Sequence, residues 1–228
     1  MSDSRKYYAA YDERYKTAHK KGVSWASDKS TPIVMNVIRQ YHVQPESELL
    51  EIGCGEGRDS KVVLDNGYHL TAADISEEAI SYCQEHMPEY AKNFKVLDCL
   101  SCELENTFHF IYSVAVIHML VIDGDRNGFY RFIHDHLKSD GIALICSMGD
   151  GKIEMKSDTC RAFELQERDH PSGKIMVAAT SCRMVSFKTF EEELINNDLS
   201  IIEKGVTSAL PEFDNLMYAV VRKRCNLL

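Results

Sequence analysis

Short apolar runs alternate with stretches of helical periodicity along most of this 228-residue chain, and this alternation limits the folds open to it. Seven runs have the apolar, β-branched and aromatic composition typical of buried strands. They cover residues 49–52, 69–73, 94–97, 110–116, 142–147, 199–205 and 216–222. Strands separated by helices form parallel sheets with helices on both faces. The pattern therefore predicts an α/β fold with a doubly wound, mainly parallel, seven-stranded sheet.

The predicted helices have recognisable ends. Pro32 follows Thr31, as in a first helical turn with Thr31 at the N-cap. A second helix is expected from residue 58 until a stop at Gly67, and a third begins after the cap residue Ser76. Two further helices are predicted over residues 127–137 and 187–197.

Two segments depart from the alternation. A loop containing Pro211 joins the last two apolar runs and leaves no room for a helix, so we expect the final strand to be antiparallel. Residues 155–186 contain the turn-rich sequence DHPSG between two extended stretches, which predicts an inserted hairpin. Ligands of parallel sheets bind beyond the carboxyl ends of the strands, where this insertion would cover them.

Length and composition restrict the protein class. The length fits a single domain over residues 1–228, and no apolar run approaches a membrane span. The net charge of −9 disfavours a nucleic-acid partner. The first residues lack the apolar core of a signal peptide, so we expect a cytoplasmic location and free thiols. Cys99 and Cys102 have metal-site spacing but no second pair, so we predict no metal.

The sequence LLEIGCGEGRDS at residues 49–60 places a glycine loop directly after a predicted strand. Its glycines are Gly53, Gly55 and Gly57, and its carboxylates are Glu51, Glu56 and Asp59. Such loops commonly bind nucleotides. A pyrophosphate here would meet repulsion of about 1 kcal/mol or more from each carboxylate. An adenosine ligand that carries an ammonium and a sulfonium avoids this cost, and S-adenosylmethionine is such a ligand.

Two further acids follow the next predicted strands. Asp74 ends the second strand, where a carboxylate can accept hydrogen bonds from both ribose hydroxyls. Asp98 follows the third strand and is a candidate acceptor for the adenine amino group. Either acid alone is also a common strand-end residue, but the glycine loop and both acids occur on three successive strands.

This series of motifs resembles that of the class I S-adenosylmethionine-dependent methyltransferases. It consists of LLEIGCGEGRDS, TAADIS, KVLDCL and FIYSVAVIHML within residues 30–148. The sequence GCGEGRDSKVVLDNGY further resembles the small-molecule branch that includes the tellurite and thiopurine methyltransferases. The resemblance implies a Rossmann-like methyltransferase fold with the last strand antiparallel. It also implies S-adenosyl-L-methionine as cofactor, S-adenosyl-L-homocysteine as product, and a monomer or homodimer.

The resemblance also assigns cofactor contacts by motif. The methionine part would lie against the glycine loop, the ribose and adenine at the second and third strands, and the sulfonium at the fourth. The implied residues are Glu51, Gly53, Cys54, Gly55, Gly57, Arg58, Asp74, Ile75, Asp98, Cys99, Leu100, and Ser113 or Val114.

The acceptor side is less defined. The chain has SVAVIHML where adenine N-methyltransferases carry an Asn-Pro-Pro-Tyr type of tetrad, which favours a small-molecule acceptor. His118 would have a pKa suited to a general base, and the alternative is a histidine that packs against adenine. Residues 1–30 are expected to form a lid in which Tyr11, Tyr15 and Trp25 contact the acceptor, although the helical spacing of the tyrosines also fits simple packing.

These observations predict S-adenosylmethionine-dependent methyl transfer to a small molecule. Two alternatives remain open: an NAD-dependent oxidoreductase, and a non-catalytic module that binds S-adenosylmethionine.

Overall fold

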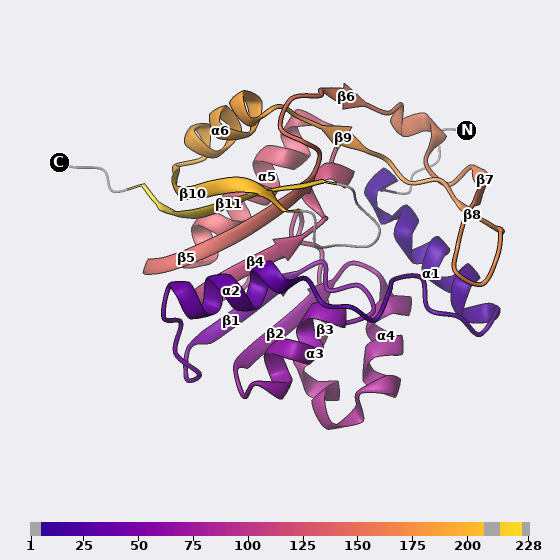
Figure 1. The fold of residues 1–228 in the computed structure, drawn as a ribbon, viewed down its shortest axis with the longest axis horizontal. Coiled ribbons are helices and arrows are strands. Elements are labelled where there is room, and N and C mark those ends of the chain that lie inside the picture. The colour runs from indigo at the N-terminus through magenta and orange to yellow at the C-terminus, as the bar shows by residue number, and fades with distance from the viewer. Residues whose placement is uncertain (1–5, 208–214, 225–228) are drawn as a thin grey trace.

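A seven-stranded sheet forms the centre of the protein (Figure 1). The computed structural model describes residues 6–207 and 215–224, so the predicted loop around Pro211 lies outside the described residues. The strand order is β10-β11-β5-β4-β1-β2-β3. The strands are β1 (Glu48–Ile52), β2 (His69–Asp74), β3 (Phe94–Val96), β4 (Phe108–Val114), β5 (Leu137–Met148), β10 (Leu199–Thr207) and β11 (Leu216–Lys223). All seven predicted strands are confirmed, with ends that differ by several residues in β5.

The pairing pattern confirms the predicted topology. Strand β1 pairs in parallel with both β2 and β4, and β2 pairs in parallel with β3. Strand β11 is antiparallel to both of its neighbours, β5 and β10. Since the chain moves outward from β1 through β3 and then returns to β4 on the other side of β1, the switch point lies between β1 and β4. Ligand sites of open α/β sheets form at such a point.

Helices cover both faces of the sheet (Figure 1). The covering helices are α2 (Pro32–Gln40), α3 (Arg58–Asp65), α4 (Glu77–His86), α5 (Asp123–His136) and α6 (Phe187–Asn196), whereas α1 (Ala10–Lys20) packs against α4 and the hairpin strand β8 (Ile175–Ala178). The described residues also contain the 3₁₀ turns η1 (Tyr7–Ala9), η2 (Pro88–Asn93), η3 (Ile117–Met119) and η4 (Thr159–Arg161).

The sequence of β1 explains why two layers of helices are needed. Leu49 and Leu50 are both fully buried, although adjacent side chains of a strand point to opposite faces. Leu49 belongs to the core cluster formed with α2, α3 and α4, and Leu50 belongs to the cluster formed with α5 and α6. The sheet is therefore apolar on both sides and each side requires a cover.

Local signals mark several helix ends correctly. The Ser76 side chain caps α4 by accepting from the Ala79 amide, as predicted. Thr31 occupies the N-cap position of α2, but its side chain makes no capping hydrogen bond there. It donates instead to Asp59 at the start of α3, so the predicted cap is replaced by a tertiary contact.

Residues 155–186 form two small antiparallel ladders. Strand β7 (Leu165–Arg168) pairs with β8 (Ile175–Ala178) as a hairpin, and β6 (Met155–Lys156) pairs with β9 (Arg183–Met184). The hairpin lies beside α1 at one end of the molecule (Figure 1). The N-terminal helix and the insertion thus meet on the side of the sheet where β1 and β4 end.

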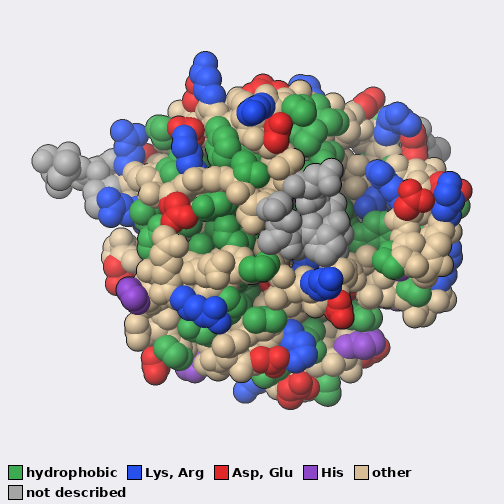
Figure 2. Space-filling model, viewed as in Figure 1, with side chains coloured by type: hydrophobic (Ala, Val, Ile, Leu, Met, Phe, Trp, Pro, Cys, Tyr) green, Lys and Arg blue, Asp and Glu red, His purple; other side chains and the backbone are tan. Residues whose placement is uncertain are grey.

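No helix in the described part of the chain is both long and apolar enough to cross a membrane. Acidic and basic side chains are intermixed on the face seen in Figure 2.

Candidate active site

The glycine loop after β1 adopts a backbone that favours glycine at each predicted position. Gly53, Gly55 and Gly57 all have positive φ angles, of 76°, 53° and 78°. A Cβ on Gly53 would lie 2.2 Å from Cγ2 of Val116, and one on Gly55 would lie 2.7 Å from the Tyr15 hydroxyl. The loop therefore depends on glycine for both its conformation and its close contacts.

A cavity of about 130 Å³ opens beside this loop, at the ends of β1, β2 and β4. Its walls contain most of the predicted cofactor residues, namely Glu51, Gly53, Cys54, Gly55, Arg58, Asp74, Ile75 and Val114. The predicted lid residues Tyr11, Tyr15 and Trp25 line the same cavity. The structure thus brings together residues from three strand ends and from the N-terminal segment.

Asp74 forms a buried carboxylate at the wall of this cavity. It is 8% exposed and accepts hydrogen bonds from the amides of Gly55 at 2.8 Å and Ser76 at 2.9 Å. Burial raises its pKa. Each oxygen uses one acceptor position for these amides, and a carboxylate has about four such positions, so Asp74 keeps capacity for two ligand hydroxyls.

The three carboxylates of the loop do not form the open anionic cluster that the sequence suggested. Glu51 is buried and accepts hydrogen bonds from Ser60 and Tyr112. Burial, followed by the Asp59 charge, raises the pKa of Glu51 to about 8. Burial therefore favours the protonated form of Glu51, whereas the sequence suggested a charged group.

The other two carboxylates hold the N-terminal segment. Glu56 accepts from the amides of Trp25 at 2.6 Å and Ala26 at 2.7 Å, and it lies 2.8 Å from Nε2 of His19. Asp59 accepts from the amide and the hydroxyl of Thr31. These contacts fix residues 19–31 over the glycine loop, a role that local sequence did not reveal.

Helix α1 is anchored to the start of α4 as well. Asp12 accepts hydrogen bonds from the Ser76 hydroxyl at 2.7 Å and the Glu78 amide at 3.2 Å, where the macrodipole of α4 favours a carboxylate. Tyr15 is 8% exposed and packs against Tyr11. Residues 7–31 therefore form a cover that is attached at several points.

Five predicted cofactor residues lie outside the cavity lining: Gly57, Asp98, Cys99, Leu100 and Ser113. Asp98 accepts from the Lys6 ammonium and, at 3.2 Å, from the hydroxyl of Tyr8, which does line the cavity. The Ser113 hydroxyl is fully buried and has no hydrogen-bond partner among the described residues. Contacts of these five residues with a cofactor stay predictions.

His118 lies in η3 and is 4% exposed. Burial, together with the nearby Arg126 charge, lowers its pKa to about 4. A ring with this pKa is neutral at pH 7 and is a weak base, so the expectation of a pKa suited to proton abstraction is wrong. Its role in catalysis stays a prediction.

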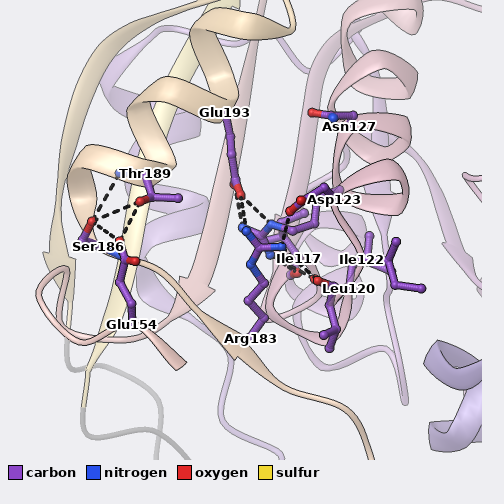
Figure 3. A network of polar contacts seen from close by, with 12 residues as sticks. Ile117, Leu120, Ile122, Asp123, Asn127, Glu154, Arg183, Ser186, Thr189 and Glu193 are labelled. Carbon is purple, nitrogen blue, oxygen red and sulfur yellow. Dashed lines mark hydrogen bonds and ion pairs between the residues drawn. The ribbon is translucent and has the colours of Figure 1, made fainter. Parts of the chain in front are cut away.

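An ion-pair network holds the turn that carries His118. Arg126 of α5 is 1% exposed, donates to the Ile117 and Leu120 carbonyls, and pairs with Glu193 of α6 through two nitrogens at 2.7 and 2.6 Å. Figure 3 shows Glu193 reaching from its helix toward the labelled Ile117 and Leu120. Arg183 of β9 donates to the Val121 carbonyl at 2.9 Å, which ties the insertion to the same turn.

A second cavity, of about 1430 Å³, lies beneath the N-terminal segment and the insertion. Tyr11, Trp25 and Ala26 line both cavities, so the two spaces share a wall. His118 and Arg14 face the larger one. Arg14 was not singled out in the sequence, because an arginine in a polar helix carries no local mark of burial.

Comparison with known proteins agrees with this architecture. The family model described as a methyltransferase domain matches residues 49–141. The malonyl-[acyl-carrier protein] O-methyltransferase of Acetivibrio thermocellus is 26% identical over 149 residues, which are 63% of this chain and 52% of that protein. The juvenile hormone acid O-methyltransferase of Bombyx mori is 28% identical over 129 residues, 54% of this chain and 44% of that protein. The chain spans about half the length of these curated relatives.

A solved structure supports the fold over nearly the whole chain. The 1,6-didemethyltoxoflavin-N1-methyltransferase of Burkholderia thailandensis, with its substrate and S-adenosylhomocysteine bound, superposes with a TM-score of 0.72 at 15% identity. The superposition covers 99% of this chain and 92% of that chain. Residues 49–141 thus match a methyltransferase domain, and the chain has the fold of the class I S-adenosylmethionine-dependent methyltransferases.

Proposed function

We propose that the protein transfers the methyl group of S-adenosyl-L-methionine to a small-molecule acceptor. The observation that carries the proposal is the cavity at the switch point, where Asp74 and the glycine loop lie together beside a larger second cavity. Because Tyr11, Trp25 and Ala26 line both cavities, the residues of the first would hold the cofactor next to an acceptor bound in the second.

The residues of the first cavity suit this cofactor chemically. The Asp74 carboxylate, held by two amides, would accept from the ribose hydroxyls. Glu51 would release its proton and pair with the cofactor ammonium, since a nearby cation lowers the pKa of a carboxyl group. Arg58 would pair with the cofactor carboxylate.

When bound, the cofactor would supply an activated methyl group, and the protein would contribute position and exclusion of water. Tyr15 and Trp25 would close over the site from the N-terminal segment, which Glu56 and Asp59 hold in place. With its low pKa, His118 is poorly suited to deprotonate an acceptor. An acceptor that is already ionised at neutral pH requires no base.

Net charge and the state of the cysteines support the proposed partners and a cytoplasmic location. The net charge of −9 supports a small-molecule acceptor and disfavours nucleic acid. The described cysteines are all free thiols, in agreement with a reducing cytoplasmic environment. A monomer or a homodimer would both be compatible with a site built within one chain.

A turnover assay tests the proposal. The purified protein would be incubated with S-adenosylmethionine and panels of carboxylic acids, phenols, thiols and amines, and S-adenosylhomocysteine would be quantified. We expect acceptor-dependent product formation that is lost in Asp74→Ala. Tight cofactor binding without turnover on any acceptor would instead support a non-catalytic binding module, and a preference for NAD would support an oxidoreductase.

A further inference from the structure

Arg14 is a buried cation in the wall of the larger cavity. Its residue is 4% exposed, and its Nε and Nη2 atoms donate to the Ala178 carbonyl at 3.2 and 2.8 Å. Nη2 also lies 3.2 Å from the Thr180 hydroxyl. Among the described residues, no carboxylate forms an ion pair with Arg14. A charge removed from water is costly without an opposite charge, so this arrangement favours an anionic ligand.

Aromatic rings fix the position of this guanidinium. It lies 4.7 Å from the ring centre of Tyr11 and 4.7 Å from that of Trp25. These are the two rings that line both cavities. Arg14 therefore lies beside the wall that separates the acceptor space from the cofactor space.

Ser181 provides a second, independent observation. It lines the larger cavity, is 4% exposed, and its hydroxyl has no hydrogen-bond partner among the described residues. It directly follows Thr180, whose hydroxyl contacts Arg14. A buried hydroxyl without a partner is costly, and a bound anion near Arg14 would provide its acceptor.

The described acids that line this cavity form no ion pair with Arg14. Asp28 and Asp169 are exposed to solvent, and Asp150 accepts from the amides of Lys152 and Ile153. The rest of the lining includes the apolar side chains of Val23, Met148, Ile153 and Met184. The lining is otherwise mixed, with Arg168 and His170 among its polar members, so the cavity combines a buried cation and a hydroxyl donor with apolar side chains on part of its wall.

We propose that Arg14 and Ser181 form a carboxylate receptor in the larger cavity, and that the methyl acceptor is an amphipathic carboxylic acid. The guanidinium supplies the opposite charge and the Ser181 hydroxyl donates a hydrogen bond. The apolar wall contacts the hydrocarbon part. That the bound acid is the methyl acceptor rests on the proposed function. Binding of the carboxylate can be measured without turnover.

Binding to the complex with S-adenosylhomocysteine tests this receptor. Octanoate and benzoate would be titrated by calorimetry against octanamide and benzamide, which keep the shape and lose the charge. We expect at least one acid to bind about tenfold or more tightly than its amide, because a hydrogen bond between two charged groups is stronger than one to a neutral amide. Equal or weaker binding of both acids relative to their amides would overturn the proposal.

Variants separate the receptor from general effects on folding. Ser181→Ala and Arg14→Lys should each reduce acid binding about fivefold or more and leave amide binding unchanged, with circular dichroism confirming the fold. Ser181→Ala removes only one hydroxyl, so it remains informative if Arg14→Lys disturbs the hairpin. The matched control is Arg161→Lys, an exposed arginine outside the cavity lining that pairs with Glu164. Unchanged acid binding in Ser181→Ala would contradict the assignment of its hydroxyl.

The cofactor also carries a carboxylate, so Arg14 could bind either the cofactor or the acceptor. One comparison distinguishes these two ligands. S-adenosylhomocysteine has this group, and 5′-methylthioadenosine lacks it. If Arg14→Lys weakens only S-adenosylhomocysteine, Arg14 holds the cofactor and the acceptor assignment is wrong. If it weakens octanoate or benzoate and neither nucleoside, the acceptor assignment is supported. Failure of the wild type to bind S-adenosylhomocysteine at all would instead refute the proposed function.

Discussion

The buried Glu51 carboxyl group should make the stability of the ligand-free protein fall as pH rises. Its pKa is raised to about 8 by burial and then by the Asp59 charge, whereas an unfolded glutamate has a pKa of about 4.3. A raised folded-state pKa means that the folded protein holds the proton more tightly. The stabilising contribution is therefore fully present below the unfolded pKa and is lost as pH rises through the folded pKa.

The size of this effect follows from the separation of the two pKa values. Each pKa unit corresponds to about 1.4 kcal/mol, so the full separation sets an upper limit of about 5 kcal/mol. Relaxation of the site and entry of water reduce this limit, and we expect a loss of about 2–4 kcal/mol between pH 5 and pH 9.

Glu51→Gln removes the titrating group and keeps the shape of the side chain. The free energy of unfolding would be measured by urea denaturation at pH 5, 7 and 9, without cofactor. We expect the free energy of unfolding of the wild type to fall relative to that of Glu51→Gln as pH rises. Glu105→Gln, at an exposed position, serves as the control and should track the wild type. Parallel pH profiles for the wild type and Glu51→Gln would refute the reasoning.

Three further perturbations test the loop, the cover and the buried ion pair. Gly53→Ala places a Cβ 2.2 Å from a valine methyl group at a φ of 76°, so urea denaturation should show a free energy of unfolding lower by about 2–4 kcal/mol. The control Gly124→Ala, whose Cβ would meet nothing within 4 Å, should be tolerated, and equal effects of the two variants would contradict the steric argument. Glu56→Gln weakens the attachment of residues 19–31, so calorimetry should show about tenfold weaker binding of S-adenosylhomocysteine, and limited proteolysis should show faster cleavage within residues 19–31. Unchanged binding would mean that the cover does not contribute to cofactor affinity. Arg126→Met removes the buried partner of Glu193 and should lower the free energy of unfolding by about 3–5 kcal/mol. The double variant Arg126→Met/Glu193→Gln should lose less than the sum of the two single variants, and additive losses would show that the two side chains are not coupled.

The fold was accessible from the sequence because its signals are local. Adjacent leucines at 49 and 50 indicate a strand that is buried on both faces, and a serine before two glutamates indicates a helix start at Ser76. Both patterns depend on nearest neighbours along the chain. The predicted positions of strand ends were less accurate. In β5, pairing with β4 and β11 extends the strand beyond its apolar run.

The candidate site was only partly accessible. The spacing of the glycines and of Asp74 predicted residues that do line one cavity. The roles of Glu56 and Asp59 depend on partners 28 to 37 residues away, and no local pattern marks them. The charge of Glu51 was misjudged because a pKa depends on burial, which sequence spacing does not supply. Arg14 was missed because its contacts lie on β8 and the residues that follow it.

Calorimetric titration of the wild-type protein and Asp74→Asn with S-adenosylhomocysteine and with NAD tests the central claim most directly. The claim is that the cavity beside the glycine loop binds an adenosine ligand through Asp74 and does not accept a pyrophosphate. We predict saturable binding of S-adenosylhomocysteine by the wild type, about 10- to 100-fold weaker binding by Asp74→Asn, and no saturable binding of NAD. Binding of NAD in preference to S-adenosylhomocysteine, or equal affinity of the two proteins for S-adenosylhomocysteine, would contradict it.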